Sequence, residues 1–167
     1  MTELAGEIAD GIVLSSLTTV TLIRQLAWPA LERGFERGGR SRDSFEVGSV
    51  VFCAISDDLN EARSLMRPCV AYHAARFPDL TAKAGFAREL ETIGPAIAVG
   101  NHATAAAAVS DRMVEEIAIV GSPTQVRDKL ARYEGFVDWL VLMPPIGLAP
   151  EVSRAQIERI IDTFGRS

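Results

Sequence analysis

The chain has 167 residues, of which 48% are hydrophobic and 23% are charged, and its formal net charge is −5. These values fit one globular domain over residues 1–167 with a sizeable core. Acidic and basic residues alternate without a basic block, which argues against a nucleic-acid partner. No apolar run approaches the ~20 residues that span a bilayer, and no basic amino-terminal region marks a signal peptide. We therefore expect a cytoplasmic chain that does not bind membranes.

The first residues of the chain do not form the complete strand with which a βα domain usually begins. Residues 4–14 are typical of a helix end, a glycine-containing turn and a short buried strand at 12–14. A βα protein normally enters a domain with a complete strand. We therefore expect this chain to be the C-terminal part of a larger protein.

A helix follows, and its apolar stripe runs over residues 23–31. Pro29 lies inside this pattern and predicts a kink or a restart near Trp28. The second strand is expected at 45–55. Ser56, Asp57 and Asp58 then have the composition of a helix cap, and the next helix should run to about residue 76.

Residues 79–121 contain no convincing strand, and we interpret them as a helical insertion with helices at 84–93 and 101–117. Ser122, Pro123 and Gln125 are typical of a helix start. The third strand is expected at 136–143. The last helix should begin at Ser153, which is followed by a glutamine three residues later.

Helices thus alternate with apolar strands, and no short turn joins two strands as a hairpin. This order predicts an α/β fold with about three parallel strands. Three strands are too few to close a barrel. They leave an edge that a partner or a missing half must cover.

Recognisable catalytic motifs are absent from the sequence. It has no glycine-rich dinucleotide or P-loop motif and no zinc-protease motif. We therefore nominate no catalytic residue and no metal site. Cys53 and Cys69 are expected to be buried reduced thiols. For His73 and His102, a surface or capping role is favoured over a metal or catalytic one.

Ligands of parallel βα folds bind beyond the carboxyl ends of the strands. Ser15 and Ser16 follow the first expected strand and could hold a phosphate together with backbone N–H groups. The alternative is plain helix capping by Ser16 or Thr18. Ser56 and Asp57 follow the second strand and are better explained as caps.

Several motifs in a fixed order carry a resemblance. They include Leu-Ala-Gly-Glu-Ile-Ala-Asp-Gly-Ile-Val-Leu at 4–14, Gly-Gly-Arg at 38–40, Glu-Ala-Arg at 61–63 and Gly-Ser-Pro at 121–123. Val-Asp-Trp-Leu-Val-Leu follows at 137–142. The chain resembles the luciferase-like monooxygenase family over nearly its whole length. It is most similar to the deazaflavin-using branch of methylenetetrahydromethanopterin-reductase-like proteins.

This resemblance implies the C-terminal portion of a TIM (βα)8 barrel, with the last three strands and the helical insertion. It implies hydride transfer to or from a small-molecule substrate, or its monooxygenation, with coenzyme F420 or FMN as the cofactor. It also implies that Ser15 and Ser16 approach the cofactor phosphate. The earlier strands of the family carry most of the catalytic groups, so we expect the chain not to be active alone.

Two other arrangements stay open at this point. The chain could be a non-catalytic α/β module that dimerises through its exposed barrel strands. A homodimer could also assemble a working site from two copies. In the preferred arrangement the partner is an N-terminal barrel half.

Overall fold

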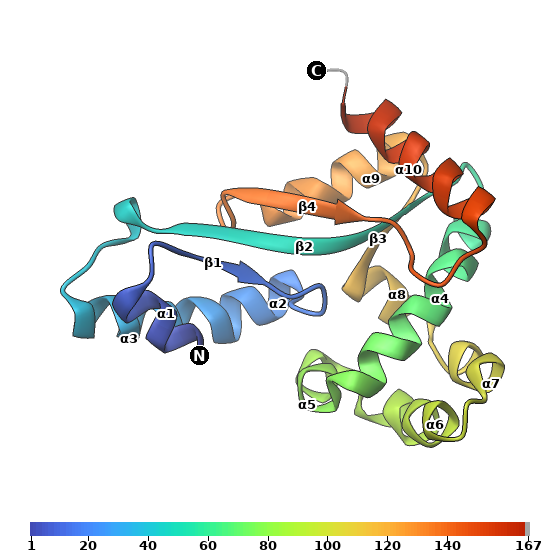
Figure 1. Ribbon diagram of the computed structural model, residues 1–167, viewed down its shortest axis with the longest axis horizontal. Helices are drawn as coiled ribbons and strands as arrows, with labels where there is room; N and C mark the ends of the chain where they lie inside the picture. The colour runs from blue at the N-terminus through green and yellow to red at the C-terminus, as the bar shows by residue number, and fades with distance from the viewer. Residues whose placement is uncertain (166–167) are drawn as a thin grey trace.

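A computed structural model describes residues 1–165 of the chain. In these residues, one sheet of four parallel strands forms the centre of the fold. The strands are β1 (Gly11–Leu14), β2 (Glu46–Ile55), β3 (Ala118–Gly121) and β4 (Trp139–Met143). All three shorter strands pair with β2, which is therefore the central strand (Figure 1).

The register places the short strands on the two edges of β2. Ser49 pairs with both Leu14 and Leu140, so β1 and β4 lie on opposite edges. Phe52 pairs with residues of both β3 and β4, so β3 also lies opposite β4. β1 and β3 therefore share one edge of β2, with β3 beyond the carboxyl end of β1.

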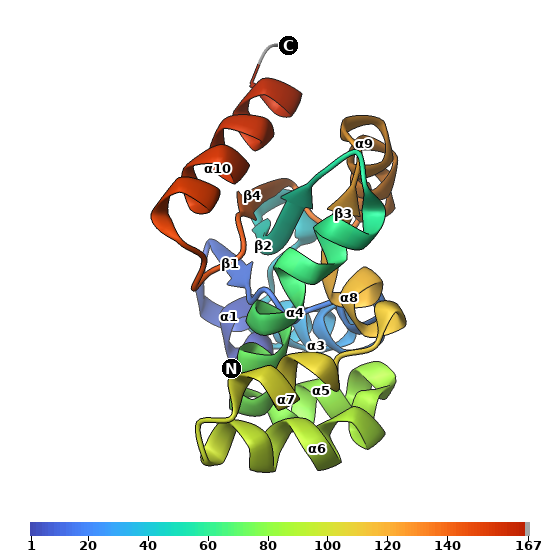
Figure 2. The same cartoon turned by 90° about the vertical axis from the view of Figure 1, so that its right-hand side faces the viewer.

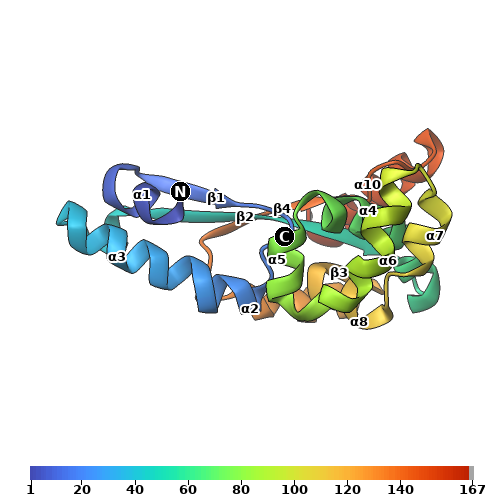
Figure 3. The same cartoon turned by 90° about the horizontal axis from the view of Figure 1, so that it is seen from below.

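The helices form two groups at opposite ends of β2 (Figure 3). The first group lies beside the amino-terminal half of the sheet, and the insertion lies beside the carboxyl-terminal half (Figure 1). Seen along β2, the strands lie between α10 at the top and the helices of the insertion at the bottom (Figure 2). The first group comprises α1 (Thr2–Ile8), α2 (Val20–Leu22), a π-helical turn (Ile23–Ala27) and α3 (Trp28–Gly38). The second comprises α4 (Leu59–Arg76), α5 (Pro78–Thr81), a π-helical turn (Ala82–Phe86), α6 (Ala87–Ala98), α7 (His102–Ala107) and α8 (Asp111–Ile117). Two further helices, α9 (Pro123–Leu130) and α10 (Pro150–Phe164), flank β4 in sequence, and 3-10 turns occupy Arg42–Ser44 and Ala131–Tyr133. No helix within residues 1–165 is both long and apolar enough to cross a membrane.

Of two expectations about helix and strand boundaries, the structure confirms one and contradicts the other. The restart expected near Trp28 is confirmed, because α3 begins at Trp28 directly after the π-helical turn. The expectation of no strand in 79–121 is wrong, because β3 pairs with the end of β2. β3 is only four residues long and follows α8 without a turn residue. In the sequence, its apolar residues therefore look like a continuation of the helix.

The helices expected at 84–93, 101–117 and from Ser153 also need correction. The first is α6, displaced towards the carboxyl end, and the second is broken, because Ser110 caps a new helix, α8. The last helix begins at Pro150 instead of Ser153. Gln156 does not cap it. Its side chain accepts from the N–H of Ile55 at 2.8 Å and donates to the carbonyl of Ile55 at 3.1 Å, which fastens α10 to β2.

Glycines allow α1 and α3 to pack with their backbones in contact. A Cβ atom at Gly34 would clash with the carbonyl oxygen of Glu3 on α1, and one at Gly38 would clash with that of Glu7. These clashing atoms belong to the backbone and cannot rotate away. The spacing of four residues places both glycines on the same face of α3.

Gly34→Ala should therefore destabilise the chain by about 1–3 kcal/mol, since overpacking forces the two helices apart. Gly94→Ala in α6 is the matched control, because an added Cβ meets nothing within 4 Å there. That variant should be neutral or stabilised by up to about 1 kcal/mol through better helix propensity. Urea unfolding followed by circular dichroism measures both, and equal stabilities would contradict the close packing.

Candidate functional site

The two faces of the sheet are covered to very different extents. Side chains of paired residues point to the same face, so Val13, Gly48, Val50, Trp139 and Val141 share one face. We call this the inner face. Val13 is 56% exposed, Val141 is 46% exposed and Trp139 is 39% exposed. The opposite face is buried against α3, α9 and α10 and includes Val47, Ser49 and Val51.

Parallel sheets are normally covered on both faces. The amino-terminal and middle parts of the inner face are an exception, because their side chains stay partly exposed to solvent. At Phe52, the next inner-face residue of β2, cover resumes, because Phe52 is 0% exposed and packs with α4. The uncovered part of the inner face, which we call bare, is therefore exposed to water in this chain. In proteins with parallel sheets, such a surface is normally buried.

Ser15 and Ser16 lie in a turn at the carboxyl end of β1, as the sequence places them. The Thr18 N–H donates to the carbonyl of Ser15 at 2.8 Å, and the two hydroxyls of Ser15 and Thr18 are 3.2 Å apart. Neither Ser16 nor Thr18 caps the following helix. Thr19 does, by accepting from the Leu22 N–H at 3.2 Å. The alternative of helix capping by Ser16 or Thr18 is therefore wrong.

A small hollow of about 230 Å³ adjoins this turn. Thr18 and Leu14 line it from the turn, and Lys83 lines it from the π-helical part of the insertion. The carboxylate of Asp79 and several apolar side chains also line this hollow, whereas Ser15 and Ser16 do not. The hollow is therefore not by itself an anion site, and the donors available to a phosphate here are the hydroxyl and backbone N–H groups of the Ser15–Ser16 turn.

The carboxyl end of β2 is distant from this turn. Leu14 is level with Ser49, and β2 continues six residues further, to Ile55, which corresponds to about 20 Å along a strand. Ser56 donates to Glu61 at 2.5 Å, and Asp58 is the helix N-cap. The capping role expected for this segment is confirmed for Asp58, whereas the expectation that Ser56 and Asp57 are the caps is wrong. Ser56 instead ties the strand end to the first turn of α4.

His73 lies at the carboxyl end of the inner face, so the surface or capping role favoured for it from the sequence is wrong. Its ring lies 4.8 Å from that of Phe52 and 5.4 Å from that of Tyr72. Both ring nitrogens are buried without a hydrogen-bond partner among the described residues. Burial, and secondarily Arg76, lowers its pKa. The spacing from Met66 through Cys69 to His73 on one helical face was the signal that it points inward.

The described residues contain no group of three or more histidine, cysteine or acidic side chains that could hold a metal ion. Cys53 and Cys69 are both free and buried, as expected. Burial raises the pKa of the Cys53 thiol to about 12, so it stays protonated and unreactive. These thiols are therefore parts of the core.

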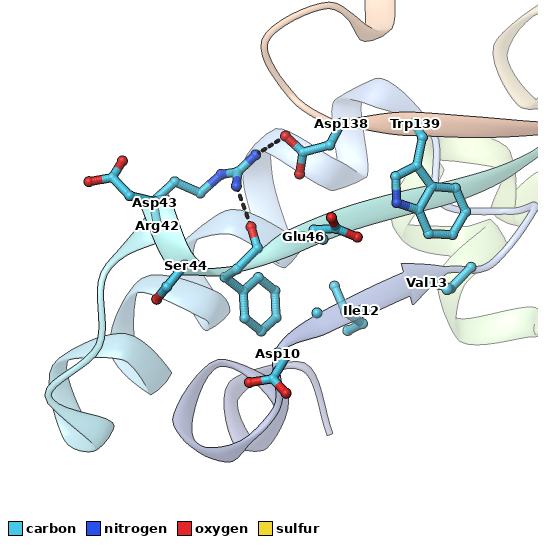
Figure 4. A pocket seen from close by; sticks show the side chains of 11 residues that line it. Asp10, Ile12, Val13, Arg42, Asp43, Ser44, Glu46, Asp138 and Trp139 are labelled. Atoms are coloured by element: carbon cyan, nitrogen blue, oxygen red, sulfur yellow. Dashed lines mark hydrogen bonds and ion pairs between the residues drawn. The ribbon is translucent and has the colours of Figure 1, made fainter.

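A hollow of about 710 Å³ lies at the other end of the sheet, at the amino ends of β1, β2 and β4 (Figure 4). Asp138 and Arg42 form an ion pair at 2.6 Å on its rim, and Trp139 and Val13 line it from the inner face. In βα barrels this end contributes to stability, whereas chemistry takes place at the carboxyl end. We therefore do not assign the catalytic site to this hollow.

Asp138 should make the free energy of unfolding depend on pH in the acidic range. Partial burial raises its pKa, but hydrogen bonds from the Val47 N–H at 2.7 Å and from Arg42 outweigh this, so the pKa is lowered. A lowered folded pKa stabilises the chain above the ordinary carboxyl pKa, about 4, and this contribution is lost as pH falls through the folded value. Asp138→Asn should cost about 1 kcal/mol at neutral pH and weaken the acid dependence.

Urea unfolding between neutral and acidic pH measures this effect. Asp43→Asn is the matched control, since Asp43 lines the same hollow and is exposed. An acid dependence that Asp138→Asn leaves unchanged would show that another carboxylate is responsible.

Comparisons with known proteins give consistent results. Residues 1–138 match the family described as luciferase-like monooxygenase. The chain is 25% identical over 154 residues to 5,10-methylenetetrahydromethanopterin reductase of Archaeoglobus fulgidus, a match that covers 88% of this chain and 46% of that protein. It is 28% identical over 144 residues to an uncharacterised protein of Mycobacterium tuberculosis, covering 83% and 42%.

Solved structures agree. The coenzyme F420-dependent tetrahydromethanopterin reductase of Methanopyrus kandleri superposes with a TM-score of 0.75 at 26% identity, covering 99% of this chain and 46% of that one. An F420-dependent secondary alcohol dehydrogenase superposes with a TM-score of 0.65 at 12% identity, which supports the fold alone. The chain spans less than half the length of these relatives. The expected fold, part of a TIM barrel with parallel strands, is confirmed, with four strands in place of three.

Proposed function

Because the chain belongs to the luciferase-like monooxygenase family, we propose that it is the C-terminal part of an oxidoreductase that uses coenzyme F420. The cofactor preference follows the coenzyme F420-dependent reductase of Methanopyrus kandleri, and FMN is the second choice. The observation that carries the proposal is the bare inner face. A barrel interior is the surface that would be uncovered if the remaining strands of the family fold were supplied by an N-terminal barrel half.

Each part of this chain would have a defined task in the completed barrel. The inner face would close against the added strands and exclude water from the barrel interior. Ser15 and Ser16 would hold the cofactor phosphate through hydroxyl and backbone N–H groups. The bound deazaflavin or flavin supplies the capacity for hydride transfer. No general acid or base is assigned to this chain, and we expect no activity from it alone.

The bare inner face also supports a second candidate function. Two copies of the chain could bury their exposed residues, Val13, Trp139 and Val141, against each other. The result would be a non-catalytic α/β module that exists as a dimer. Sedimentation of the purified chain distinguishes the two, since only this second function requires a stable homodimer.

The phosphate assignment is tested by the double variant Ser15→Ala, Ser16→Ala. The barrel is completed with the amino-terminal half of the Archaeoglobus fulgidus reductase, and coenzyme F420 binding is followed by fluorescence. Loss of two hydrogen bonds to an anion should weaken binding by about 10- to 100-fold. The control is Ser41→Ala, Ser44→Ala at the amino end of β2, which should bind as the unmodified chain does. Equal affinity of both double variants would refute the assignment.

A further inference from the structure

A third cavity, of about 440 Å³, lies between α4, the α6–α7 junction and the loop from β4 to α10. The loop reaches α4 on the side of the insertion (Figure 1). This volume falls in the range of small-molecule pockets, about 300–1,000 Å³. The residues that decide its chemistry are Cys69, Tyr72, Ile97, His102, Ile146 and Gly147.

The cavity adjoins the carboxyl end of the inner face. Tyr72 lines the cavity, and its ring lies 5.4 Å from that of His73. His73 in turn contacts Phe52, the last inner-face residue paired with β4. A molecule in the cavity would therefore lie beside the end of the barrel at which ligands of this fold bind.

The lining selects against charged ligands. None of the described lining residues is Asp, Glu, Lys or Arg. Two polar side chains, Tyr72 and His102, can each donate or accept a hydrogen bond. A metal ion is disfavoured at Cys69, because burial raises the pKa of its thiol to about 11 despite a hydrogen bond with the backbone of Ile146.

We propose that this cavity binds a neutral small molecule with a ring-shaped or branched apolar body and one hydroxyl or carbonyl group. The apolar body would contact Ile97 and Ile146, and the polar group would bond to Tyr72 or His102. That this molecule is the substrate of the completed enzyme rests on the function proposed above. Its binding requires only the residues of this chain.

The test is titration of the full chain with 2-naphthol, a neutral bicyclic alcohol, followed by NMR of carbon-13-labelled methyl groups. Saturable shifts should appear at Ile97, Ile146 and Ala71, which line the cavity, and not at Val13 or Val141 on the inner face. The anion 2-naphthoate should bind at least about tenfold more weakly, because the described lining residues offer its carboxylate no cationic partner.

Matched variants locate the binding. Ile146→Trp fills the cavity and should weaken 2-naphthol binding at least about tenfold. Val99→Trp adds the same side chain just after α6 at a position that is 79% exposed and outside the lining, and it should leave binding unchanged. Tyr72→Phe removes only a hydroxyl and should weaken binding about two- to tenfold if that group bonds to the ligand, and His102→Leu should do so if the imidazole does.

Four results would overturn the proposal: no saturable shift at Ile97 and Ile146, shifts that centre on the inner face, an affinity that Ile146→Trp does not change, or binding of 2-naphthoate as tight as that of 2-naphthol or tighter. These failures are separate from failure of the proposed function, since that function is tested by F420 binding to the completed barrel and not by this chain alone.

Discussion

Replacing Val141 by Glu should abolish association through the inner face, with a loss of affinity of more than about 100-fold. Val141 lies in the middle of β4 and is 46% exposed, so a carboxylate there stays hydrated in the isolated chain. Once another half-barrel or a second copy covers the inner face, the same carboxylate would be buried without a partner. Burying an unpaired charge costs several kcal/mol.

Sedimentation velocity measures this effect on the chain alone and on its mixture with the amino-terminal half of the Archaeoglobus fulgidus reductase. Val99→Glu is the control, because Val99 is exposed and lies after α6, away from the sheet. The melting temperature of both variants should match that of the unmodified chain. Unchanged association of Val141→Glu would show that the inner face is not the interface.

Phe52→Ala should destabilise the chain by about 3–5 kcal/mol, more than Gly34→Ala or Asp138→Asn. Phe52 is fully buried at the point where β2 pairs with both β3 and β4. Its ring contacts His73 on α4 and joins the sheet to the insertion. Truncation would leave a cavity between these two parts, because the surrounding backbone is held by strand pairing.

Equilibrium urea unfolding is the appropriate measurement. Phe77→Ala serves as the comparison, since Phe77 is 38% exposed at the end of α4 and should cost far less. A cost below about 1 kcal/mol for Phe52→Ala would mean that the insertion and the sheet are stabilised independently.

Local sequence signals predicted much of the fold. Continuous apolar residues at 50–55 indicated a strand covered on both faces, and this holds for the carboxyl-terminal part of β2. Ser122 and Gln125 form the expected capping box of α9. The strand at 118–121 was missed because four apolar residues directly after a helix carry no periodicity that distinguishes strand from helix.

The site was less predictable, because it depends on register and on distant packing. In the sequence, Ser15 and Ser56 occupy equivalent positions, because each directly follows a strand. Only the pairing of β1 with the first half of β2 reveals how far apart they lie. Thr19, and not Ser16, caps the helix, although nothing in the spacing of these hydroxyl residues distinguishes them. The spacing of Met66, Cys69 and His73 indicated that His73 points inward, but its contact with Phe52 depends on how α4 packs on β2.

The most direct measurement is a fluorescence titration of coenzyme F420 into three samples: this chain, the amino-terminal half of the Archaeoglobus fulgidus reductase, and the two together. We expect saturable binding only by the mixture, accompanied by a rise in melting temperature, since a ligand that binds the assembled state stabilises it. If sedimentation shows that the two halves associate while the mixture binds F420 no better than the amino-terminal half alone, this chain does not contribute to the cofactor site.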